Sequence, residues 1–132
     1  MPHPAPNTFL PLSTPVLHIL LALADEERHG YGIMREVKTR TDDEVRLGPG
    51  TLYGAIKRLL NDGLIETSGE RPDPAIDDER RTYYRLSGLG AKVLHAELDR
   101  LNKIIAQAIG KQLSLSAALS IGSKGDLTGG RV

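Results

Sequence analysis

The clearest pattern of apolar and polar positions lies between Gly48 and Ile65. Thr51 is a suitable N-cap there, because its hydroxyl can accept a hydrogen bond from a free amide of the first turn. Gly63 is a suitable C′ residue, because glycine readily takes the left-handed conformation found at helix ends. The pattern predicts a turn, a short helix, a stop and the start of a strand. The helix has one apolar stripe at helical spacing, formed by Leu52, Ile56, Leu59 and Leu60.

The face of this helix opposite the stripe is polar and contains no acid. It carries Tyr53, Gly54, Lys57 and Asn61, with Arg58 at its edge. The two cations can neutralise phosphates, the tyrosine can pack on sugar, and the glycine lets another backbone approach closely. Glycine in a helix costs about 1 kcal/mol relative to alanine, so its presence favours a close neighbour. The pattern is typical of a helix that docks on a polyanion, and it also fits an amphipathic helix with a solvated outer face.

Two further helices are predicted before this one. Residues 13–15 carry helix-start signals, and residues 16–24 are apolar nearly all round, which indicates a helix buried on most sides. His18 interrupts that run, and a lone histidine at a helix edge is more often structural than a metal ligand. A second helix opens at His29-Gly30-Tyr31, where the histidine and the tyrosine orient its start, and it fades into the polar residues 39–44. A short segment then joins the second and third helices, as in a helix-turn-helix.

Two strands follow the third helix. Residues 64–67 form the first, and residues 82–86 alternate in the way that predicts the second. Between them, residues 69–79 contain two prolines and carry one arginine against five acids, a net charge of −4. Because such a tip would be repelled by phosphate, we expect it to be mobile. Arg80 and Arg81 would then lie at the base of the second strand, where they either contact phosphate or pair with the acids of the loop.

A long helix is predicted after Ser87, which is a suitable cap. Its apolar residues recur at spacings of 4, 3, 4 and 3, which is a heptad seam, at Leu94, Leu98, Leu101, Ile105 and Ala108. Counted from Leu89, the apolar stripe runs over about 20 residues, or roughly 30 Å, and a three-helix core cannot cover a stripe of that length. We therefore predict a homodimer with Leu94, Leu98, Leu101 and Ile105 in the interface. The alternative is one intramolecular helix laid across the core.

These patterns divide the chain into four parts. Residues 1–12 contain four prolines and predict an extended arm. Residues 13–86 form the helices and strands of the main domain, and residues 87–110 form the long helix. Residues 111–132 form a tail, and its last dozen glycine-rich residues are expected to be disordered. The predicted fold class is mainly α with a small β wing.

Composition and charge narrow the function of these 132 residues. Seventeen basic and seventeen acidic residues give a net charge of zero, which counts against nucleic-acid binding by the chain as a whole. The charges are, however, unevenly distributed along the chain. Residues 46–61 contain three cations and no acid, and residues 80–92 contain four cations and no acid. The basic character is therefore concentrated on the third helix and the second strand.

The sequence also argues against several classes of protein. Without cysteine there are no disulfides, no thiolate chemistry and no cysteine-bound zinc, which suits a reducing cytoplasm. The first basic residue is Arg28, so the basic start of a signal peptide is missing. The longest apolar run, residues 19–24, is too short to span a membrane. No catalytic motif, phosphate loop or paired metal-ligand motif is present, so we expect neither an enzyme nor a cofactor.

Four motifs occur in one order along the chain. They are His-Gly-Tyr-Gly-Ile-Met at residues 29–34, Gly-Pro-Gly-Thr-Leu-Tyr at 48–53, Lys-Arg-Leu-Leu-Asn-Asp-Gly-Leu-Ile at 57–65, and Arg-Thr-Tyr-Tyr-Arg-Leu-Ser-Gly-Leu-Gly at 81–90. Together they resemble the PadR family of bacterial winged helix-turn-helix transcription regulators, over roughly residues 10–101. The resemblance implies a winged helix-turn-helix followed by a dimerisation helix, as in the shorter subtype of the family.

The resemblance also implies a function. The chain would be a cytoplasmic, homodimeric repressor whose recognition helices enter the major groove of double-stranded DNA at the two half-sites of a pseudopalindromic operator. On this sequence the DNA contacts fall on Thr51, Tyr53, Gly54, Lys57, Arg58, Asn61, Arg80 and Arg81. A small, often aromatic, effector bound near the dimer interface would release the repressor. Some relatives stack flat drugs between tryptophans at that place, and this chain contains no tryptophan.

A second hypothesis remains open on the sequence. A winged-helix domain can serve as a protein–protein adaptor without contacting DNA, and the zero net charge favours that interpretation. The two hypotheses differ in one measurable property. Phosphate contacts make DNA binding depend on salt, whereas an adaptor shows no such dependence.

Overall fold

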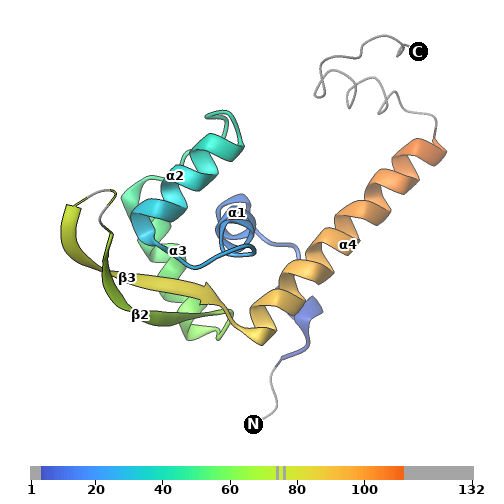
Figure 1. Cartoon of the computed structure of the whole chain (residues 1–132). Coiled ribbons are helices and arrows are strands. Elements are labelled where there is room, and N and C mark those ends of the chain that lie inside the picture. Colours follow the sequence, from blue (N-terminus) through green and yellow to red (C-terminus); the bar gives the residue numbers. More distant parts are fainter. Residues whose placement is uncertain (1–3, 74, 76, 112–132) are drawn as a thin grey trace. The chain divides into compact units, whose positions relative to one another are not determined.

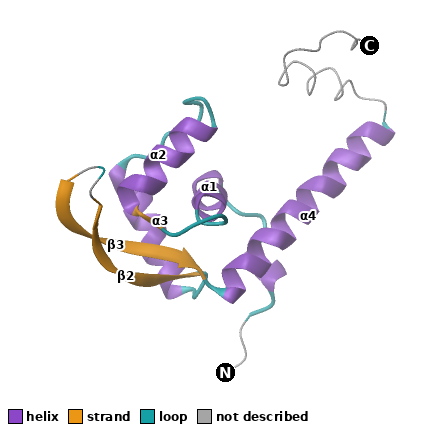
Figure 2. Cartoon of the chain, in the orientation of Figure 1, coloured by secondary structure: helices purple, strands orange, loops and turns teal. Residues whose placement is uncertain are grey.

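The computed structural model describes residues 4–73, 75 and 77–111. Helices dominate and a small antiparallel sheet accompanies them (Figure 2), so the predicted fold class is confirmed. In chain order the elements are η1 (Pro6–Phe9), α1 (Thr14–Ala22), β1 (Arg28–His29), α2 (Gly30–Arg40), α3 (Pro49–Asn61), β2 (Ile65–Asp73), β3 (Asp77–Leu86) and α4 (Gly88–Gly110).

Two units divide the chain, residues 1–97 and residues 98–132. The first unit holds η1, α1 to α3, the sheet and the start of α4, and it contains the hydrophobic core. The described part of the second unit is the remainder of α4 and the residue after it. The predicted disordered tail falls on residues 112–132, which lie outside the described residues.

Helix α1 begins where the sequence predicts. The Oγ atom of Ser13 accepts a hydrogen bond from the amide of Val16 at 3.4 Å, and Pro15 lies in the first turn. Ile19 and Leu20 are fully buried. The apolar run is therefore a core helix, and it contacts both α2 and α3.

Local hydrogen bonds define both ends of α2. At its start, Nδ1 of His29 accepts a hydrogen bond from the amide of Gly32 at 3.0 Å, which confirms the structural role predicted for this histidine. At its end, Asp42 and Asp43 have φ angles of 52° and 70°, in the left-handed region that non-glycine residues seldom occupy. The amide of Asp43 donates to the carbonyl of Lys38 at 2.8 Å and so closes the last turn.

The start of α3 differs from the prediction. Gly48 is the N-cap residue and Pro49 is the first helical residue, so Thr51 lies inside the first turn. The predicted N-cap role of Thr51 is therefore wrong. The physical reason is that proline suits the first helical position, because its φ is already helical and the amide that it lacks would be unpaired there.

The end of α3 agrees with the prediction. Gly63 has a φ of 77°, and its amide donates to the carbonyl of Leu60 at 3.1 Å. The next amide, of Leu64, donates to the carbonyl of Leu59 at 2.9 Å. These two bonds form the Schellman pattern, in which a left-handed residue satisfies the last carbonyls of a helix. The turn then directs the chain into β2.

The sheet has three antiparallel strands in the order β1–β3–β2. In β1, Arg28 is paired with Tyr84 and His29 with Tyr83. The sequence does not predict this strand, because two residues are too short to show a strand period. Its effect is to attach the start of α2 to the wing through the backbone.

Strands β2 and β3 form one long hairpin, shown in Figure 1. Most of residues 69–79, predicted to be a loop, lies in strands, because β2 continues to Asp73 and β3 begins at Asp77. The prediction failed because prolines and acids are rare in strands, whereas here β2 is an edge strand, which tolerates proline. Gly69, with a φ of 115°, lies at a bulge where the register shifts.

Helix α4 begins at the predicted cap. The Oγ atom of Ser87 accepts a hydrogen bond from the amide of Gly90 at 2.9 Å, and the amide of Ser87 donates to the carbonyl of Leu64 at 3.1 Å. A Cβ atom at Gly90 would lie only 1.8 Å from that same carbonyl oxygen. Glycine at this position is what allows α4 to start so close to the connection between α3 and β2.

The described part of the predicted N-terminal arm, residues 4–12, is not extended throughout. It forms the short helix η1, and its apolar residues pack against the core of their own chain, at Phe9, Leu10 and Leu12. The amide of Leu12 donates to the carboxylate of Glu97 at 3.0 Å, and Glu97 is buried. The sequence does not single out Glu97, because its partner lies 85 residues away along the chain.

Candidate nucleic-acid interface

The outer face of α3 has the orientation that its periodicity predicts. Leu52, Ile56 and Leu59 are buried in the core. The opposite face is exposed to solvent along the helix, at Thr51, Tyr53, Gly54, Lys57, Arg58 and Asn61. Tyr53 is 48% exposed, and a Cβ atom placed at Gly54 would have no neighbour within 4 Å. The face is therefore free to meet another molecule, although its role in DNA binding stays a prediction.

Tyr53 rests against the start of α2. A Cβ atom at Gly30 would lie 2.2 Å from the Tyr53 hydroxyl oxygen, so the ring occupies the space that a side chain at residue 30 would need. The glycine of the first motif and the tyrosine of the second are thus neighbours in space. This contact fixes the direction in which the exposed tyrosine leaves α3.

A small cavity lies where α2, α3 and β3 meet. Its volume is about 180 Å³, and it is lined by His29, Gly30, Tyr53, Arg80, Arg81, Thr82 and Tyr84. Burial, and to a smaller extent the nearby Tyr53, raises the pKa of the Tyr84 phenol. The cavity brings two arginines of the wing to the same place as the tyrosine of α3, a juxtaposition that the sequence alone does not predict.

The two wing arginines lie in the distal half of the hairpin. Arg80 is paired with Pro72 and Arg81 with Arg71, next to the pair of Asp73 and Asp77 that closes the ladder. Their predicted place at the base of the strand is therefore wrong, because β3 begins earlier than expected. The Arg80 guanidinium donates to the backbone carbonyl of Glu70. Part of its hydrogen-bonding capacity is therefore taken up within the hairpin.

Ion pairs attach the hairpin to the residues before α2. Arg71 contacts Glu27 at 2.5 Å, and its guanidinium lies 3.7 Å from the centre of the Tyr83 ring. Arg85 contacts Glu66 at 2.8 Å and Glu27 at 3.9 Å. The hydrogen bond from Arg71 is the main reason why the pKa of Glu27 lies below its usual value. Much of the basic charge of the wing is therefore paired on the protein itself.

His29 makes a second long-range contact. Its Nε2 atom lies 2.8 Å from Oδ2 of Asp73, at the end of β2, and the imidazole is buried. Because Nδ1 already accepts the amide of Gly32, the proton of the neutral ring is on Nε2 and is donated to Asp73. This hydrogen bond is the largest cause of the lowered pKa of Asp73. The sequence contains no signal for the pair, whose members are 44 residues apart.

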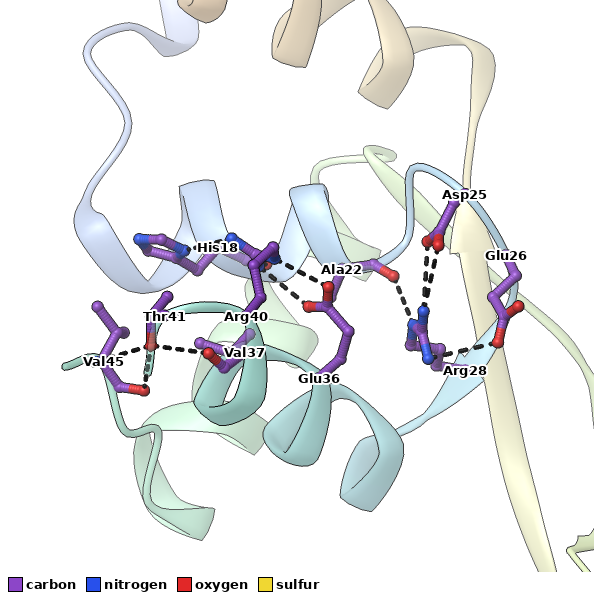
Figure 3. A network of polar contacts seen from close by, with 10 residues as sticks. All are labelled: His18, Ala22, Asp25, Glu26, Arg28, Glu36, Val37, Arg40, Thr41 and Val45. Atoms are coloured by element: carbon purple, nitrogen blue, oxygen red, sulfur yellow. Dashed lines mark hydrogen bonds and ion pairs between the residues drawn. The ribbon is translucent and has the colours of Figure 1, made fainter. Parts of the chain in front are cut away.

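A polar network holds α2 against α1 (Figure 3). Arg40 pairs with Glu36 at 2.8 Å, donates to Nδ1 of His18 at 3.1 Å and donates to the His18 carbonyl at 3.3 Å. Burial, followed by the positive charge of Arg40, lowers the pKa of His18. The histidine therefore has the structural role that the sequence favours. Among the described residues, no group of three or more His, Cys, Asp or Glu side chains could hold a metal ion.

The heptad seam on α4 is only partly exposed. Leu94 is 6% exposed and belongs to the core of its own chain, so it offers little surface to a partner. Leu98 and Ile105 are 42% and 44% exposed, and Ile104 and Ile109 are exposed as well. A partner would therefore meet the second half of the predicted seam.

A search of the described helices for membrane spans found none with the length and apolar character that a span requires.

Comparison with known proteins identifies the family. Residues 19–96 match the PadR-like family of transcriptional regulators. The chain is 33% identical over 96 residues to the transcriptional regulator Rv3488 of Mycobacterium tuberculosis, covering 73% of this chain and 83% of that protein. The family match covers the helix-turn-helix and the wing, where the four sequence motifs lie.

Solved structures agree with this assignment at the level of the fold. A transcriptional regulator from Clostridium thermocellum superimposes with a TM-score of 0.59 and 27% identity, covering 74% of this chain and 87% of that one. Bacillus subtilis PadR in complex with operator DNA superimposes with a TM-score of 0.57 and 23% identity, covering 67% of this chain and 48% of that one. The prediction of a regulator rather than an enzyme is thereby confirmed, and the chain belongs to the PadR-like family of transcriptional regulators.

Proposed function

We propose that this chain is a DNA-binding repressor that acts as a homodimer in the cytoplasm. The observation that carries the proposal is the outer face of α3, which is exposed, contains no acid and presents Tyr53, Lys57, Arg58 and Asn61 around Gly54. The B. subtilis PadR structure, which has the same fold, was solved with operator DNA. The proposal therefore assigns α3 to the major groove of a duplex.

In this proposal the two sets of residues have different tasks. Side chains on α3 read base edges, and Gly54 lets the helix backbone lie close to the groove. Arg80 and Arg81 reach from the wing to a flanking phosphate. Support for the second task comes from the cavity that these arginines share with Tyr53, because both then face the same side of the domain.

In this proposal a second copy of the chain completes the DNA-binding homodimer. Two recognition helices about one helical turn apart fit a pseudopalindromic operator. The exposed apolar side chains of α4 support an interface between like helices, formed by Leu98, Leu101 and Ile105 with contributions from Ile104 and Ile109. Two copies of one helix make a symmetric, self-complementary contact, which is the commonest form of homodimer.

We also propose that a small aromatic effector, as the family resemblance implies, releases the repressor. A groove of about 480 Å³ between η1 and the start of α4 supports it, because this volume lies in the range of small-molecule sites. The groove is lined by Ala5, Pro6, Asn7, Ala91, Lys92, His95 and Ala96. Stacking between indoles is ruled out because the chain contains no tryptophan.

The test begins with genomic fragments retained by the purified protein, which are sequenced to obtain the operator. Affinity is then measured against salt concentration for the parent, Lys57→Ala, Arg81→Ala and the control Lys111→Ala. We expect the first two variants to bind more weakly, and Arg81→Ala to reduce the salt slope by about one if its contact is with phosphate. The control removes one positive charge outside the proposed interface and should bind like the parent. Absence of any salt-dependent binding would favour the adaptor.

A further inference from the structure

We propose that the hydrogen bond between His29 and Asp73 is a latch that positions the wing for DNA binding. The latch joins the start of α2 to the last residue of β2, two points that are 44 residues apart in the sequence. This inference rests on the proposed DNA-binding function. It gives Asp73 a positioning role, although the negative charge of Asp73 would by itself weaken DNA binding.

The imidazole of His29 is held in one orientation. One ring nitrogen accepts the amide of Gly32 at 3.0 Å and the other donates to Asp73 at 2.8 Å. The Tyr83 ring meets it edge-on at a centroid distance of 5.1 Å, and the Tyr31 ring lies parallel to it at 6.4 Å. The side chain is only 4% exposed, so water competes poorly for its hydrogen bonds. A buried and fully bonded ring of this kind is a rigid anchor.

The end of the hairpin needs such an anchor. The ladder between β2 and β3 shifts register between Thr67 and Glu70 and again between Pro72 and Asp73. Pairing is thus irregular at two places, one of them at the end of the hairpin, and a two-stranded hairpin is only marginally stable by itself. The Asp73 side chain is 23% exposed, its Oδ2 atom is bonded to His29, and its Oδ1 atom accepts the amide of Ala75 at 3.1 Å. The same contact therefore fixes the end of the hairpin and turns a negative charge towards the protein.

The latch is close to the residues that the proposed function uses. Asp73 is adjacent in β2 to Pro72, which is the ladder partner of Arg80, and Arg81 follows one step further along. His29 itself lines the cavity that also contains Tyr53 and both wing arginines. If the latch opened, these arginines would lose their fixed place relative to α3. Binding would then carry an added cost for ordering the wing.

Electrostatics and the latch predict opposite effects for one substitution. Asp73→Ala and Asp73→Asn both remove one negative charge near the DNA, which by charge alone should tighten binding equally. Asparagine can offer its one oxygen to the Nε2 proton of His29 and alanine cannot, and neither variant then accepts the Ala75 amide as well, so the two variants differ only in the contact with His29. The latch therefore predicts that Asp73→Asn binds at least as tightly as the parent. It predicts that Asp73→Ala binds more weakly, by roughly fivefold.

The experiment measures the affinity of the full chain for a mixed-sequence 24-base-pair duplex by fluorescence anisotropy, at about 50 mM salt. Glu70→Ala is the matched control, because it removes an acid of the same hairpin that does not contact His29; it should bind like the parent or more tightly. Amide hydrogen exchange of the wing is measured without DNA on the same proteins. Exchange in β2 and β3 should be faster in Asp73→Ala than in Asp73→Asn.

A variant of the histidine tests the other half of the pair. His29→Asn keeps a good N-cap for α2, because its amide oxygen can accept the Gly32 amide, but its shorter side chain cannot reach Asp73. We expect it to weaken DNA binding as Asp73→Ala does, with α2 still folded by circular dichroism. Adding Asp73→Ala to His29→Asn should cause no further loss, because the two residues act through one contact.

The outcomes separate the latch from the proposed function. If the parent shows no salt-dependent affinity for any duplex, the DNA-binding function fails, whatever the exchange rates show. If the parent binds DNA but Asp73→Ala binds as tightly as Asp73→Asn, the latch is overturned while the DNA-binding function stands. An additive loss in the double variant would equally overturn it, because the two residues would then act independently.

Discussion

Single glycines set how closely two parts of the backbone approach in this protein. At Gly90 the obstacle to any side chain is a backbone carbonyl, which cannot move without displacing the turn after α3. At Gly30 the obstacle is the end of the Tyr53 side chain, which can swing away. The two positions therefore differ in what a methyl group would disturb, namely the fold at one and the direction of Tyr53 at the other.

Gly90→Ala should destabilise the fold strongly. The added carbon would overlap the Leu64 carbonyl oxygen and disturb its hydrogen bond from the Ser87 amide, at a cost of about 1–3 kcal/mol or more. Gly88→Ala is the control, because its Cβ meets nothing within 4 Å and alanine is the better helix former. Urea unfolding measures the free energy of unfolding of both variants, provided that the m-value is the same as that of the parent. Equal stability of the two variants would mean that α4 does not start as described.

His18 should make stability depend on pH. Burial and Arg40 hold its folded pKa below the ordinary value of 6.5, so the unfolded chain binds a proton more readily than the folded chain. The contribution of neutral His18 to the stability of the fold is complete above pH 6.5, and it is lost as the pH falls from there towards the lowered pKa. His18→Gln cannot titrate and can still accept from Arg40. The melting temperature of the parent relative to His18→Gln should therefore decrease as the pH is lowered from about 7.5 to about 5.5.

Arg40→Gln provides the control for this measurement. It removes the positive charge that, after burial, lowers the pKa of His18, and it keeps the histidine. The melting temperature of Arg40→Gln should therefore decrease less than that of the parent over the same pH range. If the parent and Arg40→Gln behave alike, the contact of His18 with Arg40 in the structure does not govern its protonation.

At the scale of elements, α3 combines an apolar face that belongs to the core with an outer face that is free. Leu52 and Ile56 fix its rotation about its own axis, because both are buried. The same rotation exposes Tyr53, Gly54 and Lys57. Any test of the outer face is thus also a test of the helical phase.

Substitutions at Gly54 test that face. Gly54→Ala should stabilise the fold slightly, by up to about 1 kcal/mol, because nothing lies within 4 Å of the added carbon. Gly54→Gln should also fold, but its bulk should keep the helix out of the groove and weaken operator binding. Operator affinity is compared with melting temperature for both variants. Unchanged binding by Gly54→Gln would show that this face does not approach the DNA closely.

At the scale of the whole molecule, the core lies within residues 1–97, and the second half of α4 carries an apolar stripe of its own. Five apolar residues within one helix are exposed or only partly covered, namely Leu98, Leu101, Ile104, Ile105 and Ile109. An apolar surface of this kind is typical of a protein–protein contact. It supports the proposed homodimer.

Leu98→Glu combined with Leu101→Glu should prevent that dimer. Four carboxylates would be brought together across a twofold axis, where like charges repel and lose solvation. Analytical ultracentrifugation should show a monomer or an aggregate. The control is Ala106→Glu with Gln107→Glu, which adds the same number of carboxylates at exposed positions outside the seam. A dimer that survives the first pair of substitutions would place the interface elsewhere.

The sequence by itself determined the features that depend on neighbours within one turn of a helix. Ser87 caps the helix that follows it and Gly63 ends α3, as predicted from single positions, and α1 begins at the start signals of residues 13–15. The buried and exposed faces of α3 also follow from its period alone. Such signals are readable because the atoms that interact are three to five residues apart along the chain.

Only the tertiary structure decided the features whose partners are distant in sequence. The hairpin extends through an acidic, proline-containing stretch because β3 pairs with β2 and with Arg28 and His29 on its other side. Asp73 turns inward because a buried histidine meets it, and Glu97 is buried where it accepts the amide of Leu12. Local composition opposed each of these outcomes. They arise because contacts made possible by folding outweigh local preference, and no pattern within a short window reveals which distant residue will provide them.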